Sequence, residues 1–449
     1  MIIGSLFSQY RAHGVKWYFS DRLLSKESDV LKERKITHSW ADTSIENRSK
    51  LARFDHYPAY QDLKTQLAML SDISKSPIYL DVNEGIARDT IHTEDEEKIH
   101  FSGYNYLGMS GDSYVTEACV NAIKTYGSSV SASRIASGDK PLHRQLEKTI
   151  AQFIGVEDSM VMTAGFLTNA STISYLFGEH DVIFMDSLAH NSIVYGAAAS
   201  HAMQYAFPHQ NLAYLTNLLH EVRDQYQRVL IIIEGVYSAD GDIPNLPALI
   251  KLKKQYDAFL MIDEAHSIGT IGKTGRGIGE YHQVNPRDVD IWMGTLSKSL
   301  ASCGGYIAGC SELIDLLKYK SPGFVYSCGL TPANSAAALA SLELCIKEQW
   351  RVEKLQSNAD FFRSLLKEYS IDTGLSYDSP IIPIVVGETE SALLFCKLLR
   401  DQGIYCHPMI YPAVEKNKAR VRFFINCLHS KEQLKRAADI IFNSLYRIK

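Results

Sequence analysis

Five short runs of continuously apolar residues, alternating with segments of helical period, constrain the fold of this chain more than any other feature. Strands buried on both faces of a parallel sheet have this unbroken apolar character, whereas half-buried strands alternate. Strand–helix alternation at this spacing therefore predicts an α/β domain with a mainly parallel sheet covered on both faces. The predicted strands are residues 160–163, 182–185, 229–233, 259–262 and 291–293.

The order of the elements changes after about residue 335. One long helix is predicted from residue 333 to about residue 368, because no early breaker interrupts it. The strands and helices predicted after it cover residues 381–386, 391–402, 404–409, 421–425 and 431–446. We therefore predict three parts: an N-terminal arm and extension (1–100), a large domain (101–335) and a small α+β domain (336–449).

The composition excludes several classes of protein. The formal net charge of -5 lacks the basic surplus that a general nucleic-acid binder needs. No window offers the roughly 18 apolar residues of a membrane span, and the first residues do not read as a secretory signal. The eight cysteines form neither a CxxC nor a zinc-binding spacing. We therefore expect a cytoplasmic globular protein with reduced thiols and no metal site.

Chemically active side chains follow the last two predicted strands. Ligands of parallel sheets bind beyond the carboxyl ends of the strands. Asp263 stands at such an end, where a buried carboxylate needs a cation, for example a protonated pyridine nitrogen, and His266 follows three residues later. Lys298 follows the fifth strand, close to the hydroxyls of Thr295 and Ser297. That lysine can form a Schiff base while the hydroxyls bind a phosphate.

The other three strand ends complete a set of groups. Gly165 opens a helix after the first strand, and backbone amides at a helix start bind anions. His190, after the second strand, is either a turn histidine or a flat ring that stacks on a cofactor. Ser238 lies in the polar loop after the third strand. Together, the five strand ends match the needs of a pyridoxal phosphate site: a phosphate cradle, a ring stack, a hydroxyl, a ring-nitrogen partner and a lysine.

With these motifs the sequence resembles the α-oxoamine synthases, which include serine palmitoyltransferase and 8-amino-7-oxononanoate synthase. The resemblance runs from about residue 101 to the C-terminus. It implies a fold-type I pyridoxal phosphate-dependent transferase, in which the large domain binds the cofactor on a mainly parallel sheet and the small C-terminal domain is α+β. Its most specific segments are Tyr106-Leu107-Gly108, Ser137-Gly138 with His143, Asp186-x-x-x-His190, Val236-Tyr237-Ser238-x-Asp240-Gly241, Asp263-Glu264-Ala265-His266 and Gly294-Thr295-Leu296-Ser297-Lys298.

The resemblance implies roles around the cofactor ring. Lys298 would carry pyridoxal 5′-phosphate and later move the Cα proton of the substrate. Asp263 would keep the pyridine nitrogen protonated, and His190 would stack on the ring. His266 and Ser238 would contact the 3-hydroxyl side, and either histidine could polarise the thioester carbonyl.

The resemblance also implies how the phosphate is held. The backbone N–H groups of Gly165 and Phe166, with Thr295 and Ser297, would bind it within one chain. Ser327 resembles the residue with which family members reach the phosphate of the neighbouring subunit. A homodimer with shared active sites is therefore expected.

The substrates follow from the same resemblance. Arg422 resembles the arginine that binds the amino-acid carboxylate, a task suited to a bidentate guanidinium. The alternative to a functional role, for both Arg420 and Arg422, is a position on an exposed strand edge. Whether Tyr104 or Asn105 meets the substrate stays open, because the residues before Tyr-Leu-Gly vary in the family. The implied reaction is the decarboxylative condensation of a small L-amino acid (glycine, alanine or serine) with an acyl thioester, giving an α-aminoketone.

The identity of the acyl donor stays open between CoA and an acyl carrier protein. Residues 54–64 and 323–326 look most like the same segments of family members associated with polyketide or fatty-acyl assembly lines. This likeness favours a carrier protein as the acyl donor. The N-terminal arm could be a binding module for such a carrier or for a membrane surface. Competing functions are an aminotransferase or aldolase on the same fold, or a non-catalytic partner subunit, although such subunits typically lose the lysine.

Overall fold

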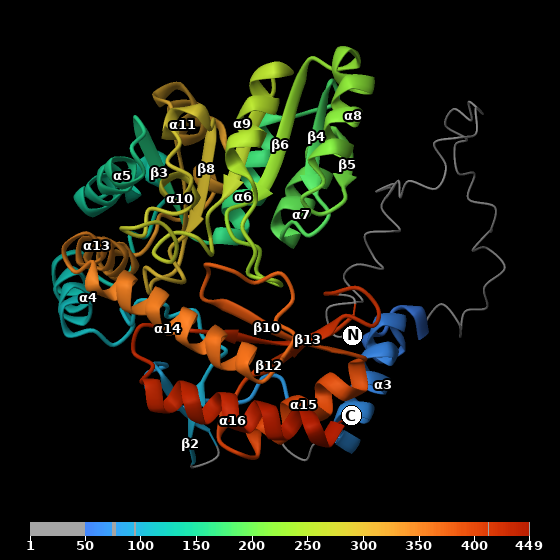
Figure 1. The fold of residues 1–449 in the computed structure, drawn as a ribbon. Coiled ribbons are helices and arrows are strands. Elements are labelled where there is room, and N and C mark those ends of the chain that lie inside the picture. The colour runs from blue at the N-terminus through green and yellow to red at the C-terminus, as the bar shows by residue number, and fades with distance from the viewer. Residues whose placement is uncertain (1–49, 74–77, 94–95, 412, 449) are drawn as a thin grey trace.

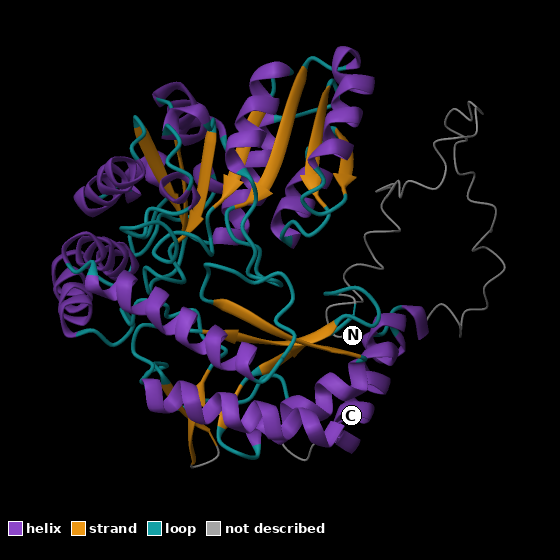
Figure 2. Cartoon of the chain, in the orientation of Figure 1, coloured by secondary structure: helices purple, strands orange, loops and turns teal. Residues whose placement is uncertain are grey.

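The computed structural model describes residues 50–73, 78–93, 96–411 and 413–448 (Figure 1). Most of the predicted N-terminal arm lies outside these residues. Two parts are visible in Figure 2, one built around a large sheet and one around smaller sheets and long helices. Within the described residues, no helix is long and apolar enough to cross a lipid bilayer.

The first part contains a seven-stranded sheet of order β3-β9-β8-β7-β6-β4-β5. All strands are parallel except β9, which pairs antiparallel with both of its neighbours. The prediction of a mainly parallel sheet is therefore confirmed. The strands are β3 (Asp158–Met162), β4 (Asp181–Asp186), β5 (Met203–Phe207), β6 (Arg228–Glu234), β7 (Phe259–Asp263), β8 (Ile291–Thr295) and β9 (Gly305–Gly309).

The unbroken apolar character of the central strands has a direct structural cause. In β6, Val229, Ile231 and Ile233 enter one hydrophobic cluster, whereas Leu230 and Ile232 enter another that contains side chains of different helices. Successive side chains of a strand point to opposite faces, so both faces of this sheet are buried. The covering helices are α5 (Pro141–Ile154), α8 (Leu212–Val222) and α9 (Leu246–Gln255) on one face, and α6 (Gly165–Leu176), α7 (Asn191–Ala199) and α11 (Ser311–Lys320) on the other.

The second part is α+β, as predicted. Its two three-stranded sheets have the orders β10-β13-β12 and β1-β2-β11. Phe101, Phe362, Phe395 and Phe423 lie in its hydrophobic core. Because β2 pairs with β11, residues near position 100 join this part, and the boundaries at 100 and 335 stay a prediction. Its elements are α3 (Pro58–Ile73), β1 (Thr90–Thr93), β2 (Glu96–His100), α14 (Trp350–Glu368), β10 (Ile381–Gly387), α15 (Thr389–Arg400), β11 (Ile404–Tyr405), β12 (His407–Met409), β13 (Ala419–Phe424) and α16 (Lys431–Ile448).

The single helix predicted over residues 333–368 is wrong. The structure has two helices there, α13 (Pro332–Lys347) and α14, which begins at Trp350. Arg351 explains the break, because its guanidinium donates to Glu348, to the carbonyl of Leu107 and to Asp112. The chain turns to make these tertiary contacts, and no glycine or proline marks the turn in the sequence.

A buried ion pair gives a test of the large sheet and its covering helix. Glu147 of α5 accepts hydrogen bonds from Arg134 at 2.5 and 3.1 Å and from the Val161 amide of β3 at 3.0 Å. We expect Glu147→Ala to lower the free energy of unfolding by about 3 kcal/mol, because the buried Arg134 would keep only Asp139 as a charged partner and the Val161 amide would lose its acceptor. Chemical denaturation measures this change.

A matched surface substitution provides the control. Glu415 pairs with Lys418 where both side chains are largely exposed. Glu415→Ala should change the free energy of unfolding by no more than about 1 kcal/mol. Equal effects of the two substitutions would contradict this account of Glu147.

Candidate active site

The predicted site residues gather where neighbouring strands of the large sheet end. β4, β6, β7 and β8 are parallel and adjacent, so their carboxyl ends share one edge. His190 follows β4, Ser238 follows β6, Asp263 ends β7 and Lys298 follows β8. Figure 1 shows this edge facing the second part of the molecule, where β10 and β13 lie.

A chain of hydrogen bonds links Asp263 to His190. The Asp263 carboxylate accepts from the Asn169 side chain at 2.8 Å and from the Ala265 amide at 2.9 Å. Asn169 also donates to the Ser192 hydroxyl at 2.9 Å, and that hydroxyl lies 2.7 Å from Nδ1 of His190. Asn169 was missed from the sequence, although its position one helical turn after Gly165 places it on the same side of α6.

Lys298 carries an amine of unusual acidity. Burial lowers the pKa of Lys298 to about 8, against the raising effects of Asp263 and Glu234. Its Nζ lies 5.5 Å from the ring centroid of Tyr104. A lysine with this pKa is partly neutral near physiological pH, which makes it a competent nucleophile and base.

Glu234 is a second buried carboxyl group at this edge. It ends β6 directly beside Asp263 in the sheet register, and both residues are 4% exposed. Burial raises the pKa of Glu234 well above its usual value, and the nearby charge of Asp263 adds to this effect. Glu234 therefore adds a neutral carboxyl group next to Asp263. Its only signal in the sequence is that a polar residue closes an apolar run.

Two neutral histidines border the cluster. Desolvation lowers the pKa of His190, and burial lowers that of His266 well below its usual range. The Tyr106 hydroxyl lies 2.8 Å from Nδ1 of His266. Because burial raises the pKa of Tyr106, the phenol keeps its proton. The neutral His266 ring and the phenol thus share one hydrogen bond at Nδ1.

A small anion cradle lies at the start of α6. Gly165 is the first residue of that helix, whose leading amides have no partner within the helix. A Cβ on Gly165 would lie 2.9 Å from Oγ1 of Thr295, so only glycine leaves room there. The Thr295 hydroxyl is 2.8 Å from that of Ser297. Backbone amides and two hydroxyls thus meet at one point, as a phosphate site requires.

Arg420 and Arg422 connect the second part to the loop after β6. They lie two residues apart on β13, so their side chains are on one face of the strand. Arg422 donates to the Ser238 carbonyl at 2.7 Å, and Arg420 forms an ion pair with Asp240. Arg420 is 6% exposed, so the alternative of an exposed strand edge is wrong for it. A Cβ on Gly241, in the same loop, would collide with the carbonyl of Ile381.

The remaining predicted residues lie around this centre. Asn105 uses its side chain on the backbone of Ala87 and Ser110, so of the two alternatives the geometry favours Tyr104 as the residue beside Lys298. Phe166 contacts Tyr195, with ring centroids 5.6 Å apart. Ser327 lies on the surface segment between α12 (Pro322–Val325) and α13, and no hydrogen bond in the described structure joins it to the strand ends.

Comparisons with known proteins agree on one family. The family model for class I and II aminotransferases matches residues 96–441. The 8-amino-7-oxononanoate synthase of Petrotoga mobilis is 38% identical over 84% of this chain and 95% of that protein. Long chain base biosynthesis protein 2c of Oryza sativa subsp. japonica is 34% identical over 82% of this chain and 78% of its own length. A solved serine palmitoyltransferase of Sphingomonas wittichii has a TM-score of 0.83 at 25% identity, covering 87% of this chain and 98% of that one.

The acidity of Lys298 can be measured by its reaction with an amine-directed acylating reagent. In protein freed of bound carbonyl compounds, we expect the rate at Lys298 to reach half its maximum near pH 8, because the neutral amine is the reactive form. Peptide mass spectrometry across a pH series locates the modified residue and gives the rate.

Asp263→Asn serves as the matched control. Asp263 raises the pKa of Lys298, so its loss should move the half-point to a lower pH. A half-point near the ordinary lysine value of 10.5 in the unsubstituted protein would contradict the prediction.

Proposed function

This chain belongs to the class I and II aminotransferase family and, within it, to the α-oxoamine synthases, and we propose that it joins a small L-amino acid to an acyl thioester. It is a pyridoxal phosphate-dependent acyltransferase that condenses an amino acid with an acyl thioester. The proposed amino acids are glycine, alanine and serine, and the proposed product is an α-aminoketone. The observation that carries the proposal is the acidic Lys298 amine beside the buried Asp263 carboxylate.

The residues present fit pyridoxal phosphate. The space left by Gly165 beside Thr295 suits the phosphate, and the amides at the start of α6 offer donors for it. Asp263 is buried and, within the described part of the chain, accepts hydrogen bonds from the neutral donors Asn169 and Ala265, so it suits a protonated ring nitrogen. His190 offers a neutral ring for stacking. His266, together with Ser238, is proposed to face the 3-hydroxyl group.

The cofactor, when bound, supplies an aldehyde and an electron-withdrawing ring that stabilises negative charge at the Cα of the amino acid. The chain supplies the rest. Lys298 would hold the aldehyde in the resting enzyme, and its amine, once free, would take the proton from Cα and return one. Asp263 holds the proton on the ring nitrogen. Arg422 binds the carboxylate of the amino acid and orients it.

The neutral histidines and Tyr104 complete the proposed site. His190 and His266 are able to donate a hydrogen bond to a thioester oxygen as it gains negative charge. The Tyr104 ring centroid lies 5.5 Å from Nζ of Lys298, an amine that is itself buried. The protein thus contributes orientation, proton transfer and the exclusion of water.

The proposed assembly is a homodimer with shared sites. Ser327 is proposed to bind the phosphate in the site of a second copy of the chain, and it lies next to Tyr326, which is 85% exposed. An acyl carrier protein is the proposed donor alongside CoA. Phe54 and Tyr57, within the run that suggested a carrier, are exposed on the surface before α3.

Replacing Lys298 tests the proposal directly. The unsubstituted protein should bind pyridoxal phosphate with a visible absorbance and, with an amino acid and an acyl thioester, should release CO2 and free thiol. Lys298→Ala should abolish both the lysine-dependent absorbance and the turnover, because no amine remains to bind the aldehyde or move the Cα proton. Absorbance spectra and a thiol assay measure the two effects.

Lys273→Ala is the control, since this lysine is exposed in the loop before α10 (Ile278–Tyr281). It should leave absorbance and turnover unchanged. Turnover is also measured with the acyl group on CoA and on a carrier protein, for the full chain and for a chain without residues 1–60. This comparison separates the two carriers. Formation of a 2-oxo acid without thiol release would favour an aminotransferase instead.

Arg422→Lys tests carboxylate binding. A lysine keeps the positive charge and loses the paired hydrogen bonds, so we expect the KM for the amino acid to rise about 10- to 100-fold. The KM for the acyl thioester should change much less. Steady-state kinetics with each substrate varied in turn gives both values.

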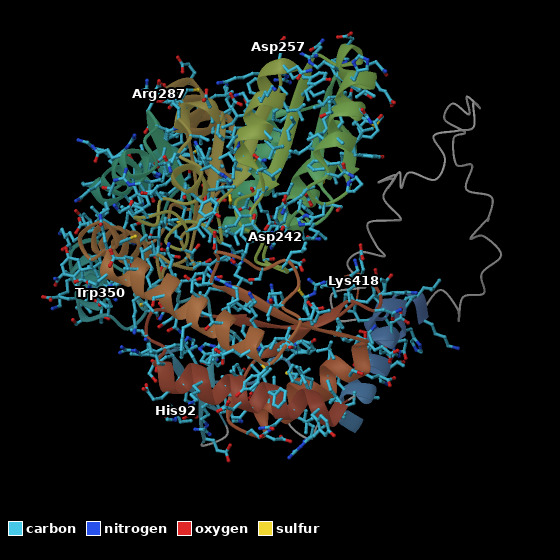
Figure 3. All side chains as sticks on the ribbon, viewed as in Figure 1. His92, Asp242, Asp257, Arg287, Trp350 and Lys418 are labelled. Atoms are coloured by element: carbon cyan, nitrogen blue, oxygen red, sulfur yellow. The ribbon has the colours of Figure 1, made fainter. Side chains whose placement is uncertain are left out.

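Arg287→Lys is the matched control. Figure 3 shows Arg287 at the end of the large sheet that lies away from the second part. Its replacement should leave both KM values unchanged. An unaltered KM for the amino acid in Arg422→Lys would remove Arg422 from the proposed site.

A further inference from the structure

His209 lies between two buried carboxylates at the active-site edge. Its Nδ1 is 2.9 Å from Oδ1 of Asp186, and its Nε2 is 2.7 Å from Oδ2 of Asp242. Both aspartates are 1% exposed. An ionised carboxylate only accepts hydrogen bonds, so both ring nitrogens must donate. The geometry therefore requires a doubly protonated, positively charged His209.

The surroundings of His209 agree with this charge. Hydrogen bonds to Asp186 and Asp242 raise the pKa of His209 to about 10, although burial opposes them. Tyr237, the third titratable group against it, packs edge-on with ring centroids 4.5 Å apart. The backbone N–H of Gln210 donates to the Asp186 carboxylate, and its side-chain amide donates to that of Asp242. Two negative charges and one positive charge thus share this buried space.

The two aspartates belong to different loops of the site. Asp186 ends β4, and its carboxylate accepts from the Leu188 amide at 2.9 Å, which shapes the turn leading to His190. Asp242 closes the loop after β6, where its carbonyl accepts from the Tyr237 amide at 3.1 Å. That loop contains Ser238, the hydrogen-bond partner of Arg422. Figure 3 shows Asp242 at the boundary between the two parts of the molecule.

We propose that His209 is a positioning residue, whose positive charge holds the His190 turn and the Ser238 loop in one fixed arrangement. Stacking on the cofactor and binding of the substrate carboxylate then both depend on a residue that contacts neither ligand. This inference rests on the proposed function, because it assigns His209 to the same site. Without its charge, Asp186 and Asp242 would repel each other and the two loops would separate.

The test compares His209→Gln with His209→Lys. Pyridoxal phosphate is titrated into the protein freed of cofactor, and the KM for the amino acid is measured after reloading. We expect His209→Gln to weaken cofactor binding and to raise that KM, each by about 10-fold or more, because charged hydrogen bonds are lost at both loops. His209→Lys keeps a cation between the carboxylates and should recover most of both losses.

The pH dependence of stability gives a second readout. His209 has a folded pKa near 10 against an ordinary value of 6.5, so its stabilising contribution is complete below about pH 6.5 and disappears as the pH approaches 10. The difference in Tm between the unsubstituted protein and His209→Gln should therefore shrink over this range. A residue that only fills space would leave the difference constant.

Two further variants keep the inference falsifiable. His282→Gln is the control, because His282 donates to the Pro244 carbonyl at 2.8 Å, just beyond Asp242, without an ion pair. If His209→Gln fails to fold, Asp242→Asn retains the Asp186–His209 pair and should raise the KM for the amino acid more than it weakens cofactor binding.

Each outcome has a distinct meaning. An effect of His282→Gln equal to that of His209→Gln, or a loss of Tm in His209→Gln with unchanged binding and KM, would overturn the positioning role. If the unsubstituted protein binds no pyridoxal phosphate, the proposed function fails first, whatever His209 does.

Discussion

The buried carboxylate of Asp263 is the charge on which the arrangement of the site depends. It sits at the end of a central strand, out of reach of bulk water, and its direct partners are the neutral donors Asn169 and Ala265. Such a group is stable only beside a cation or with a proton of its own. Its charge raises the pKa of both Lys298 and the neighbouring Glu234. The lysine is thereby favoured as a cation and the glutamate as a neutral acid. In the proposed function, a protonated ring nitrogen would supply the cation beside Asp263.

The parallel strands explain why so much of the site was predictable. When both faces of a strand are buried, its sequence becomes an unbroken apolar run, and the first polar residue after the run marks the functional edge. His190, Asp263 and Lys298 were found in this way. Two strands of the large sheet were not predicted: β5 is a partly exposed edge strand, and β9 is a five-residue strand that begins and ends with glycine.

The residues that were missed depend on contacts between distant parts of the chain. His209 meets partners 23 and 33 residues away, and no spacing in the sequence announces that meeting. Asn169 reaches Asp263 across 94 residues. The helix break before Arg351 has the same origin, since that side chain contacts Leu107 and Asp112. Local patterns predict elements and their ends, whereas buried polar networks are set by tertiary packing.

The two arginines of β13 lie two residues apart on one face of a strand paired on both sides. Arg420 is tied to Asp240, and Arg422 contacts the neighbouring Ser238 carbonyl. A single-residue insertion or deletion within this strand would turn both guanidinium groups away and present Val421, a core residue, in their place. Evolution of this strand is therefore confined to substitutions, while length variation is left to the loops on either side of it.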